Sequence, residues 1–146
     1  GIGQDRVMFA AEIDTIKDHL RLYCEVDIAL DPFPFNGATT TFQALWMGVP
    51  VVSLAGETFN SRIGGSILHH LGLRELVVNT PEAYVDCVGD LAGDLSRLRT
   101  LRMSLRARIT SSLLCDASAY ARNVEAAYRD MWRAWCKKHE KFLNMK

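Results

Sequence analysis

Short apolar runs alternate with longer segments of helical period along the first half of the chain, and this alternation limits the fold more than any other feature. The runs occupy residues 6–10, 27–30, 50–54 and 76–78, and each is continuous rather than alternating in polarity. Continuous runs of this length are typical of strands that are covered on both faces, as in a parallel sheet. They predict an α/β fold with a Rossmann-like parallel sheet of about four strands, flanked by helices and joined by right-handed crossovers.

Helix candidates lie between these runs, at residues 15–24, 41–47 and 61–71. Two of them have the start of a capping box, in which a threonine precedes an acidic residue or a glutamine by three positions. The pairs are Thr15 with Asp18 and Thr40 with Gln43.

The second half of the chain has the period of helices. Thr80-Pro81 places a capping residue before a proline at a first helical position. Apolar residues then recur every three or four positions in three stripes, at residues 84–98, 101–109 and 120–135. We therefore expect a helical C-terminal section, with a break near residues 97–100 and a polar tail at residues 137–146.

The composition excludes several classes of protein. The 146 residues include 17 Lys and Arg against 17 Asp and Glu, whereas a nucleic-acid binder needs a concentrated positive surface. No apolar run is long enough to span a membrane, so we expect neither nucleic acid nor membrane as a partner. The arginines between positions 97 and 108 are expected to form a solvated helix face. The four cysteines form no CxxC pair, which favours buried, reduced thiols in a cytoplasmic protein.

The segment from residue 31 to residue 48 has the most chemical content. A strand is expected to end at Asp31, and the sequence Asn36-Gly37-Ala38-Thr39-Thr40-Thr41 then leads into a helix. Small residues let a ligand approach the backbone, and free N–H groups, threonine hydroxyls and the helix dipole favour a phosphate there. A helix that is merely capped by Thr40 explains the same residues, and the local pattern leaves both interpretations open.

The succession of NGATTT, MGVPVV, GETFNSR and GLRELV resembles the C-terminal catalytic region of the O-GlcNAc transferase and SPINDLY family, which has a GT-B fold. The likeness extends from about residue 6 to residue 136, through LRMSLR and AYRDMW. It implies that residues 1–136 are a nucleotide-sugar-binding lobe, part of the C-terminal lobe of the GT-B fold. Family members transfer a sugar from a nucleotide donor to Ser or Thr of intracellular proteins, without a metal or another cofactor.

The resemblance also implies roles for particular residues. Those expected to bind the donor diphosphate are Gly37, Ala38, Thr39, Thr40 and Thr41. Those expected to contact the nucleoside are Asp14, Ile16, His19 and Gln43. Gln43 stands in the place of an acidic residue that holds the ribose, and Asn36 and Arg62 are additional candidates. No catalytic residue is expected in the chain, because the acceptor side of a GT-B site comes largely from the other lobe.

Three positions depart from the O-GlcNAc branch of the family. Ala38, Ile16 and Leu22 stand where that branch has a histidine, a lysine and an arginine, so three donors to the nucleotide are missing. The donor is open between uridine-diphosphate N-acetylglucosamine, which we favour, and guanosine-diphosphate fucose. Without the other lobe and the TPR repeats that usually precede it, which recruit acceptor proteins, the chain is expected to be inactive. The alternative is a non-catalytic domain that kept the fold as a binding or assembly module.

Two further features have a structural and a functional interpretation. Glu57 is expected to cap the helix that follows residue 60 rather than to act as an acid or base. Trp135 is expected in the core, with Trp132 partly exposed. If both instead form a docking surface on the last helix, the chain is expected to self-associate.

Overall fold

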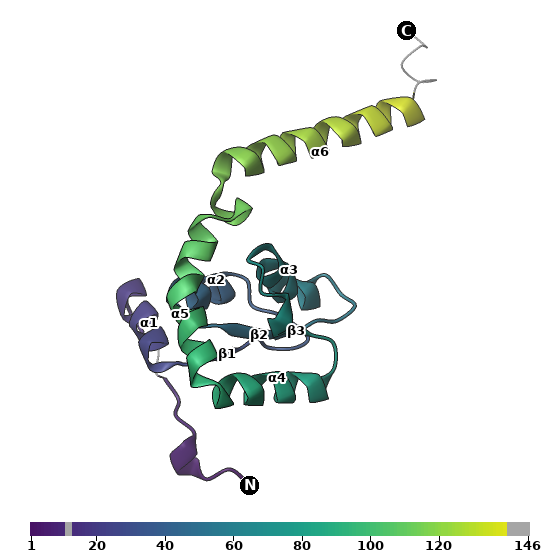
Figure 1. The fold of residues 1–146 in the computed structure, drawn as a ribbon. Helices are drawn as coiled ribbons and strands as arrows, with labels where there is room; N and C mark the ends of the chain where they lie inside the picture. Colours follow the sequence, from purple (N-terminus) through teal and green to yellow (C-terminus); the bar gives the residue numbers. More distant parts are fainter. Residues whose placement is uncertain (11–12, 140–146) are drawn as a thin grey trace. The chain divides into compact units, whose positions relative to one another are not determined.

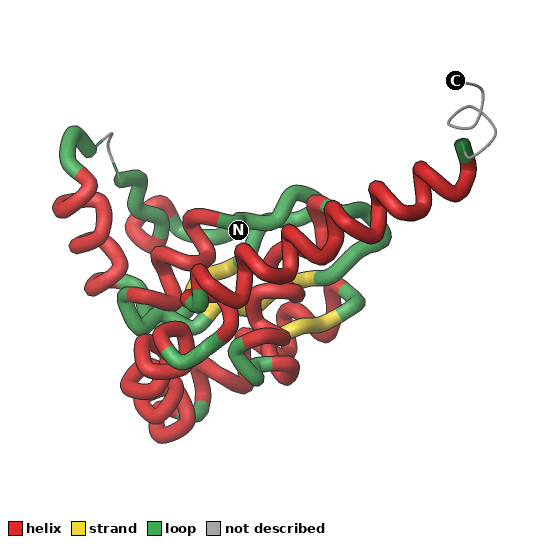
Figure 2. Tube along the Cα trace, turned by 90° about the horizontal axis from the view of Figure 1, so that it is seen from above, coloured by secondary structure: helices red, strands yellow, loops and turns green. Residues whose placement is uncertain are grey.

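The computed structural model describes residues 1–10 and 13–139, and the chain divides into two compact units, Gly1–Arg106 and Ala107–Lys146. The first unit contains a parallel sheet in the order β1-β2-β3 (Figure 1, Figure 2). The predicted α/β fold with a parallel sheet is confirmed, with three strands in the described residues instead of four. The strands are β1 (Ala29–Leu30), β2 (Val51–Leu54) and β3 (Val77–Val78).

The strand predicted at residues 6–10 is not formed. Gln4–Arg6 make the 3-10 turn η1, and residues 7–10 have no regular structure and are exposed, Phe9 by 90%. A strand needs a second strand to pair with its N–H and C=O groups, and no strand in the described ranges pairs with this run. A continuous apolar run therefore predicts a strand only where a partner is available.

Helices cover both faces of the sheet. Figure 1 shows α2 and α3 on one face and α4 on the other. The two crossovers between neighbouring strands thus run on the same face, as successive right-handed connections in one direction do. The helices of the first unit are α1 (Ile16–Leu22), α2 (Thr39–Trp46), α3 (Ile63–His70), α4 (Pro81–Gly93) and α5 (Leu95–Thr110), which continues into the second unit. The remaining 3-10 turns are η2 (Tyr23–Glu25), η3 (Asn60–Arg62), η4 (Arg74–Leu76) and η5 (Leu113–Cys115).

The core of the first unit lies around β2. All four residues of this strand are buried, as expected of a strand that is covered on both faces. Leu68 of α3, Leu91 of α4 and Leu105 of α5 are fully buried. Burying a side chain of this kind contributes about 1.5–3 kcal/mol. β1 and β3 form the edges and are only partly covered, so the prediction of full cover holds for the central strand alone.

Two of the three helix caps predicted at threonines are present. Thr15 caps α1 and Thr80 caps α4, each by accepting a backbone N–H three positions on. The predicted cap by Thr40 is wrong, because α2 already begins at Thr39 and its N-cap residue is Ala38. The residue before this N-cap, Gly37, makes a side-chain contact that is described below.

The break between the helices that follow β3 lies at Asp94 and not at residues 97–100. α4 ends at Gly93, and Asp94 Oδ1 accepts the N–H of Arg97 at 2.9 Å. Aspartate is a strong N-cap residue, so it starts α5 before the second apolar stripe begins.

Two arginines of α5 contradict the prediction of a wholly solvated face. Arg102 Nη1 donates to the carbonyl of Val26 at 2.7 Å, and Arg106 Nε donates to the carbonyl of Trp46 at 3.0 Å. The guanidinium of Arg106 also lies 5.2 Å from the centre of the Trp46 ring. These contacts attach α5 to the segment before β1 and to the end of α2.

The second unit consists mainly of α6 (Ala117–Lys138), which Asp116 caps. No residue of this helix is buried. Trp135 is 46% exposed and Trp132 is 63% exposed, so the prediction that Trp135 lies in the core is wrong. The helix includes the first two residues of the predicted polar tail, whose residues 140–146 lie outside the described residues.

Two expectations drawn from composition bear on the fold. The four cysteines are free thiols, but the expectation that they are buried is wrong, because Cys24 and Cys115 are exposed and Cys87 and Cys136 are only partly covered. In the part of the chain that the structure describes, no helix combines the length and the apolar character that crossing a membrane requires.

Candidate functional site

The loop that follows β1 is anchored on the carboxylate of Asp31, which is 4% exposed. Asp31 Oδ1 accepts the N–H of Gly37 at 2.7 Å, and Oδ2 accepts the hydroxyl of Ser53 at 2.6 Å. Its backbone carbonyl accepts the phenol of Tyr84 at 3.1 Å. Burial raises the pKa of the Asp31 carboxyl above its ordinary 3.8, against the opposing effect of the two hydrogen bonds. Asp31 therefore joins the loop to β2 and α4.

The first turn of α2 has no side-chain cap, which leaves its N–H groups available. The N-cap residue is Ala38, and the first intrahelical bond runs from the N–H of Phe42 to the Ala38 carbonyl at 3.0 Å. The N–H groups of residues 38–41 thus have no acceptor within the helix. An uncapped N-terminus just beyond the carboxyl end of a parallel strand can bind a phosphate or another anion.

The residues predicted to bind a diphosphate lie together at this N-terminus, but they differ in exposure. Thr39 and Thr40 are exposed, whereas Thr41 is only 3% exposed. A Cβ added at Gly37 would lie 2.5 Å from Thr40 Oγ1 and 2.7 Å from Thr41 Oγ1, so a larger residue does not fit. The accessible surface therefore consists of backbone N–H groups and two threonine hydroxyls.

Asn36 supports this loop from within and is 1% exposed. Its Nδ2 donates to the carbonyl of Pro32 at 3.0 Å, and its backbone N–H donates to the carbonyl of Asn60 at 3.1 Å. Its Oδ1 is buried and has no hydrogen-bond partner among the described residues. Asn36 thus shapes the loop, and its amide is too deeply buried to reach a ligand at the surface.

The four residues predicted to contact a nucleoside line one cavity of about 560 Å³, between α1 and α2. His19 Nε2 lies 3.1 Å from Gln43 Oε1, so the imidazole of α1 and the amide of α2 form a pair. The other lining residues are largely apolar, which suits the flat face of a base. They are Ala10, Ile13, Asp14, Thr15, Ile16 and Leu22.

Tyr23 links this cavity to the N-terminus of α2. Its ring meets the ring of His19 edge to face, with centroids 5.7 Å apart, and its phenol donates to the carbonyl of Thr40 at 3.4 Å. Burial raises the pKa of Tyr23, so the phenol stays protonated and can donate at neutral pH. The predicted nucleoside and diphosphate positions are therefore adjacent, as they are in a nucleoside diphosphate.

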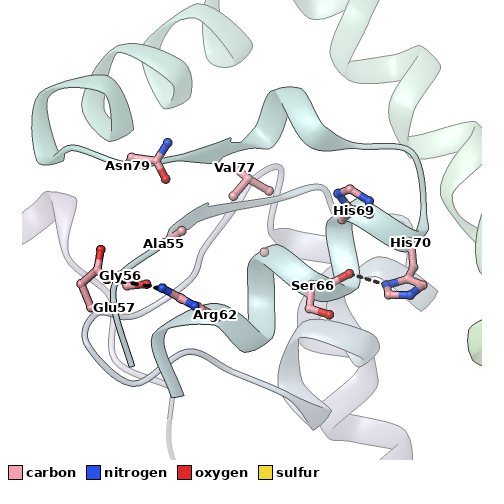
Figure 3. Close-up of a pocket in the computed structure, with 10 residues that line it drawn as sticks. Ala55, Gly56, Glu57, Arg62, Ser66, His69, His70, Val77 and Asn79 are labelled. Atoms are coloured by element: carbon pink, nitrogen blue, oxygen red, sulfur yellow. Dashed lines mark hydrogen bonds and ion pairs between the residues drawn. The ribbon is translucent and has the colours of Figure 1, made fainter. Parts of the chain in front are cut away.

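Arg62 lies elsewhere, in a second cavity of about 560 Å³ at the carboxyl ends of β2 and β3 (Figure 3). Its Nε donates to the carbonyl of Gly56 at 2.9 Å, and its Nη2 lies 3.4 Å from Glu57 Oε2. The prediction that Glu57 caps the following helix is wrong. The N–H of Ser61 instead donates to Thr58 Oγ1 at 3.3 Å.

The histidines of this second cavity are bound within the chain. His70 Nδ1 lies 2.8 Å from the carbonyl of Ser66, as Figure 3 shows, and His69 Nε2 lies 3.0 Å from Arg74 Nη2. Arg62, His69 and His70 thus each have a partner within the chain. In residues 1–10 and 13–139, no three side chains of the His, Cys, Asp and Glu types gather closely enough to hold a metal ion.

Sequence patterns do not identify Asp31, Tyr23 or Tyr84 as parts of the site. Asp31 could have been found by one signal, a carboxylate directly after an apolar run and just before a turn with asparagine and glycine. Tyr23 and Tyr84 have no comparable signal, because their contacts are made with residues 17 and 53 positions away.

The family assignment rests on most of the chain. The sequence profile of glycosyl transferase family 41 matches residues 1–124. The chain belongs to glycosyl transferase family 41. The resemblance drawn from the four motifs between residues 36 and 77 is therefore confirmed.

Relatives from plants, animals and bacteria match this family 41 chain. It is 41% identical over 136 residues to the probable UDP-N-acetylglucosamine–peptide N-acetylglucosaminyltransferase SPINDLY of Petunia hybrida, covering 93% of this chain and 15% of the petunia protein. It is 32% identical to the UDP-N-acetylglucosamine–peptide N-acetylglucosaminyltransferase of Caenorhabditis elegans, covering 92% of this chain and 12% of that protein. A mutant O-GlcNAc transferase of Thermobaculum terrenum has a similar structure, with a TM-score of 0.78, 42% identity, and cover of 85% of this chain and 24% of that one. The chain thus spans a small share of the length of its relatives.

Proposed function

We propose that this chain provides the donor-binding lobe of a protein O-glycosyltransferase. Residues 1–136 hold the nucleotide sugar, and residues 137–146 are a polar tail. The sugar is N-acetylglucosamine, with fucose as the second candidate, and the acceptor is a Ser or Thr hydroxyl. Family membership and the activities named for the petunia and nematode relatives support this proposal.

The observation that carries the proposal is the uncapped N-terminus of α2. The N–H groups of residues 38–41 and the exposed hydroxyls of Thr39 and Thr40 are donors without a charged side chain among them. Helix dipole and N–H groups together favour a diphosphate at such a place. This mode of binding is compatible with a formal net charge of zero, because it needs no basic surface.

The nucleoside occupies the cavity between α1 and α2. Ile16 and Leu22 line it where the O-GlcNAc branch has basic residues, so contact with the base is mainly apolar here. Gln43 and His19 supply the polar contacts to the ribose and the base, and Asp14 lies at an exposed position beside them.

In the proposed reaction, the acceptor hydroxyl attacks the anomeric carbon of the sugar with inversion. The bond from that carbon to the diphosphate oxygen breaks, and the nucleoside diphosphate leaves. The N-terminus of α2 stabilises the negative charge that develops on the leaving group, without a metal. We assign the acceptor contacts and the proton-accepting base to the other lobe, and recruitment of acceptor proteins to TPR repeats. The chain by itself is then inactive.

The exposed free thiols of Cys24 and Cys115 agree with a reducing compartment, and we therefore propose a cytoplasmic location. Thiols stay reduced in the cytoplasm, whereas the thiols of secreted proteins usually form disulfides.

Calorimetric titration of the 146-residue chain with UDP-N-acetylglucosamine and with GDP-fucose tests the proposal. We expect one of the two to bind, and the double variant Thr39→Ala/Thr40→Ala to bind it about tenfold more weakly, because two hydroxyl contacts are lost. Thr100→Ala is the matched control, since Thr100 is also an exposed helical threonine but lies on α5.

Two outcomes would contradict the proposal. A folded chain that binds neither nucleotide sugar at millimolar concentration has no donor site and favours the non-catalytic module. Equal losses of affinity in the double variant and in Thr100→Ala would show that binding takes place elsewhere.

A further inference from the structure

Asp31 has a buried carboxylate, and three parts of the first unit converge on this residue. Its partners are Gly37 in the loop before α2, Ser53 of β2 and Tyr84 of α4, and its backbone N–H donates to the carbonyl of Val52 at 3.0 Å. None of these partners carries a positive charge, and Asp31 forms no ion pair within the described residues. A buried carboxylate without a cation is costly for folding, so its presence calls for a role that an apolar residue cannot fill.

The space that this carboxylate occupies depends on a glycine of α3, Gly64. A Cβ added at Gly64 of α3 would collide with Asp31 Oδ2 and would lie 2.5 Å from Ser53 Oγ. A Cβ added at Gly37 would conflict with the threonine hydroxyls, whereas its distance of 3.4 Å to Asp31 Oδ1 is an ordinary contact. The backbone of α3 therefore approaches the carboxylate more closely than any residue with a Cβ would allow.

The contact with Gly37 is the one that bears on ligand binding. The N–H of Gly37 points inward to Asp31, and the next four N–H groups, of residues 38–41, are those without an acceptor in the helix. The bond between Gly37 and Asp31 thus marks the last N–H group of the loop that points into the core. The N–H groups that are available to a ligand begin at the next residue, Ala38.

We infer that Asp31 is a positioning residue for the diphosphate, which acts through Gly37 by fixing the backbone that presents the N–H groups of residues 38–41. This inference rests on the proposed function, because it assigns the diphosphate to that N-terminus. Asp31 itself contacts neither the nucleotide nor the sugar. Its role requires a hydrogen-bond acceptor at Oδ1 and does not require a negative charge.

Binding of matched ligands separates this role from a general loss of stability. Affinities of UDP and uridine, and of GDP and guanosine, are measured by calorimetry, and the ratio of diphosphate to nucleoside affinity is the readout. In Asp31→Ala we expect this ratio to fall about tenfold, while nucleoside affinity stays the same, because only the phosphate donors are displaced. In Asp31→Asn we expect the ratio to be kept, since the amide oxygen can still accept from Gly37.

Tyr84→Phe is the matched control. It removes a hydrogen bond to the backbone carbonyl of Asp31 and leaves the carboxylate and Gly37 in place. We expect it to lower the unfolding free energy and to keep the affinity ratio. A ratio that falls equally in Tyr84→Phe and in Asp31→Ala overturns the inference, and so does a ratio that is unchanged in Asp31→Ala.

Amide hydrogen exchange of the unliganded wild-type chain tests the positioning without any ligand and without a variant. We expect the Gly37 amide to exchange slowly and those of residues 38–40 to exchange fast. If Gly37 exchanges as fast as its neighbours, the inference fails even where Asp31→Ala does not fold. If Gly37 is protected but the wild-type chain binds no nucleotide, the proposed function fails and the structural role of Asp31 in the loop remains.

Discussion

At the scale of single residues, Asp31 makes the stability of the fold depend on pH in the acid range. Burial raises the pKa of this carboxyl in the folded state above 3.8, so the folded chain holds the proton more tightly than the unfolded chain. The contribution of Asp31 to the unfolding free energy is therefore fully present below pH 3.8 and is lost as pH rises through the folded-state pKa. Asp31→Asn lacks this titration.

The difference in unfolding free energy between Asp31→Asn and the wild type is the quantity to measure. We expect it to shift in favour of Asp31→Asn as pH rises from below 3.8, and to become constant above the folded-state pKa. Urea unfolding at a series of pH values up to neutrality gives this difference, in which the titration of all other carboxyls cancels. A difference that moves in the opposite direction would mean that the folded state favours the charged carboxylate.

Gln43 is the second residue at which a single atom matters. The family resemblance implies that Gln43 holds the ribose, but its Oε1 is paired with His19 Nε2 at 3.1 Å. A carboxylate can accept from His19 and from a ribose hydroxyl at the same time, and charge-assisted bonds are about twice as strong as neutral ones. We expect Gln43→Glu to bind the nucleotide sugar about fivefold more tightly in calorimetry.

Gln4→Glu is the control for Gln43→Glu. Gln4 is exposed in η1, and its substitution changes the net charge by the same amount without entering the cavity. If both variants bind equally well, the charge acts at long range. If Gln43→Glu binds more weakly than the wild type, Gln43 donates its amide N–H to the nucleotide instead of accepting from it.

At the residue level, the sequence predicts positions within one segment better than contacts between distant segments. The threonines of the first turn of α2 lie together as the family motif implied, because helix geometry fixes the spacing within one segment. Asp31 could not be understood in this way, since its partners Ser53 and Tyr84 are 22 and 53 positions further on. Contacts of that range depend on how strands and helices pack, and no local pattern encodes them.

At the scale of elements, helix caps between residues close in the chain could be predicted more easily than the pairing of distant strands. Thr15 and Thr80 cap their helices as expected, because a cap needs only the next three residues. The run at residues 6–10 has the composition of a strand but finds no partner strand in the described residues. The prediction that Thr40 caps α2 is wrong, because the helix begins one residue earlier, at Thr39.

The position of α5 also depends on contacts that cannot be predicted from its sequence pattern. An arginine between apolar residues has the same pattern on a solvated face as on a face that touches backbone carbonyls. Here Arg102 and Arg106 donate to the carbonyls of Val26 and Trp46, which lie 76 and 60 positions earlier. These bonds hold the segment before β1 and the end of α2 against one helix, and so they support both sides of the proposed nucleotide site.

At the scale of the whole molecule, the two units differ in how far they bury their apolar side chains. The first unit encloses a core around β2, and its carboxyl edge holds the proposed site. The second unit buries no residue of α6. A stripe of exposed apolar side chains runs along one face of this helix. Its exposed members are Tyr120, Tyr128, Met131, Trp132 and Trp135.

This stripe predicts self-association of the 146-residue chain. Trp132 and Trp135 stack with centroids 5.3 Å apart, and Trp135 stacks on His139 at 4.5 Å, so the aromatic surface is ordered before any partner arrives. Exposed patches of this kind favour binding to a second apolar surface, and buried tryptophans contribute most to such interfaces. We expect Trp132→Ala/Trp135→Ala to weaken association about a hundredfold or more in sedimentation velocity over a range of concentrations.

The matched control is a substitution on the opposite face of the same helix. Arg122 lies on the polar side of α6 among other charged residues, and Arg122→Ala is expected to associate like the wild type. Because no residue of α6 is buried, neither variant removes core packing, and a change in association then reports the aromatic stripe itself. A wild-type chain that stays monomeric at the highest concentration tested would show that the stripe is not sufficient to join two copies, and equal weakening by Arg122→Ala would assign association to charge instead.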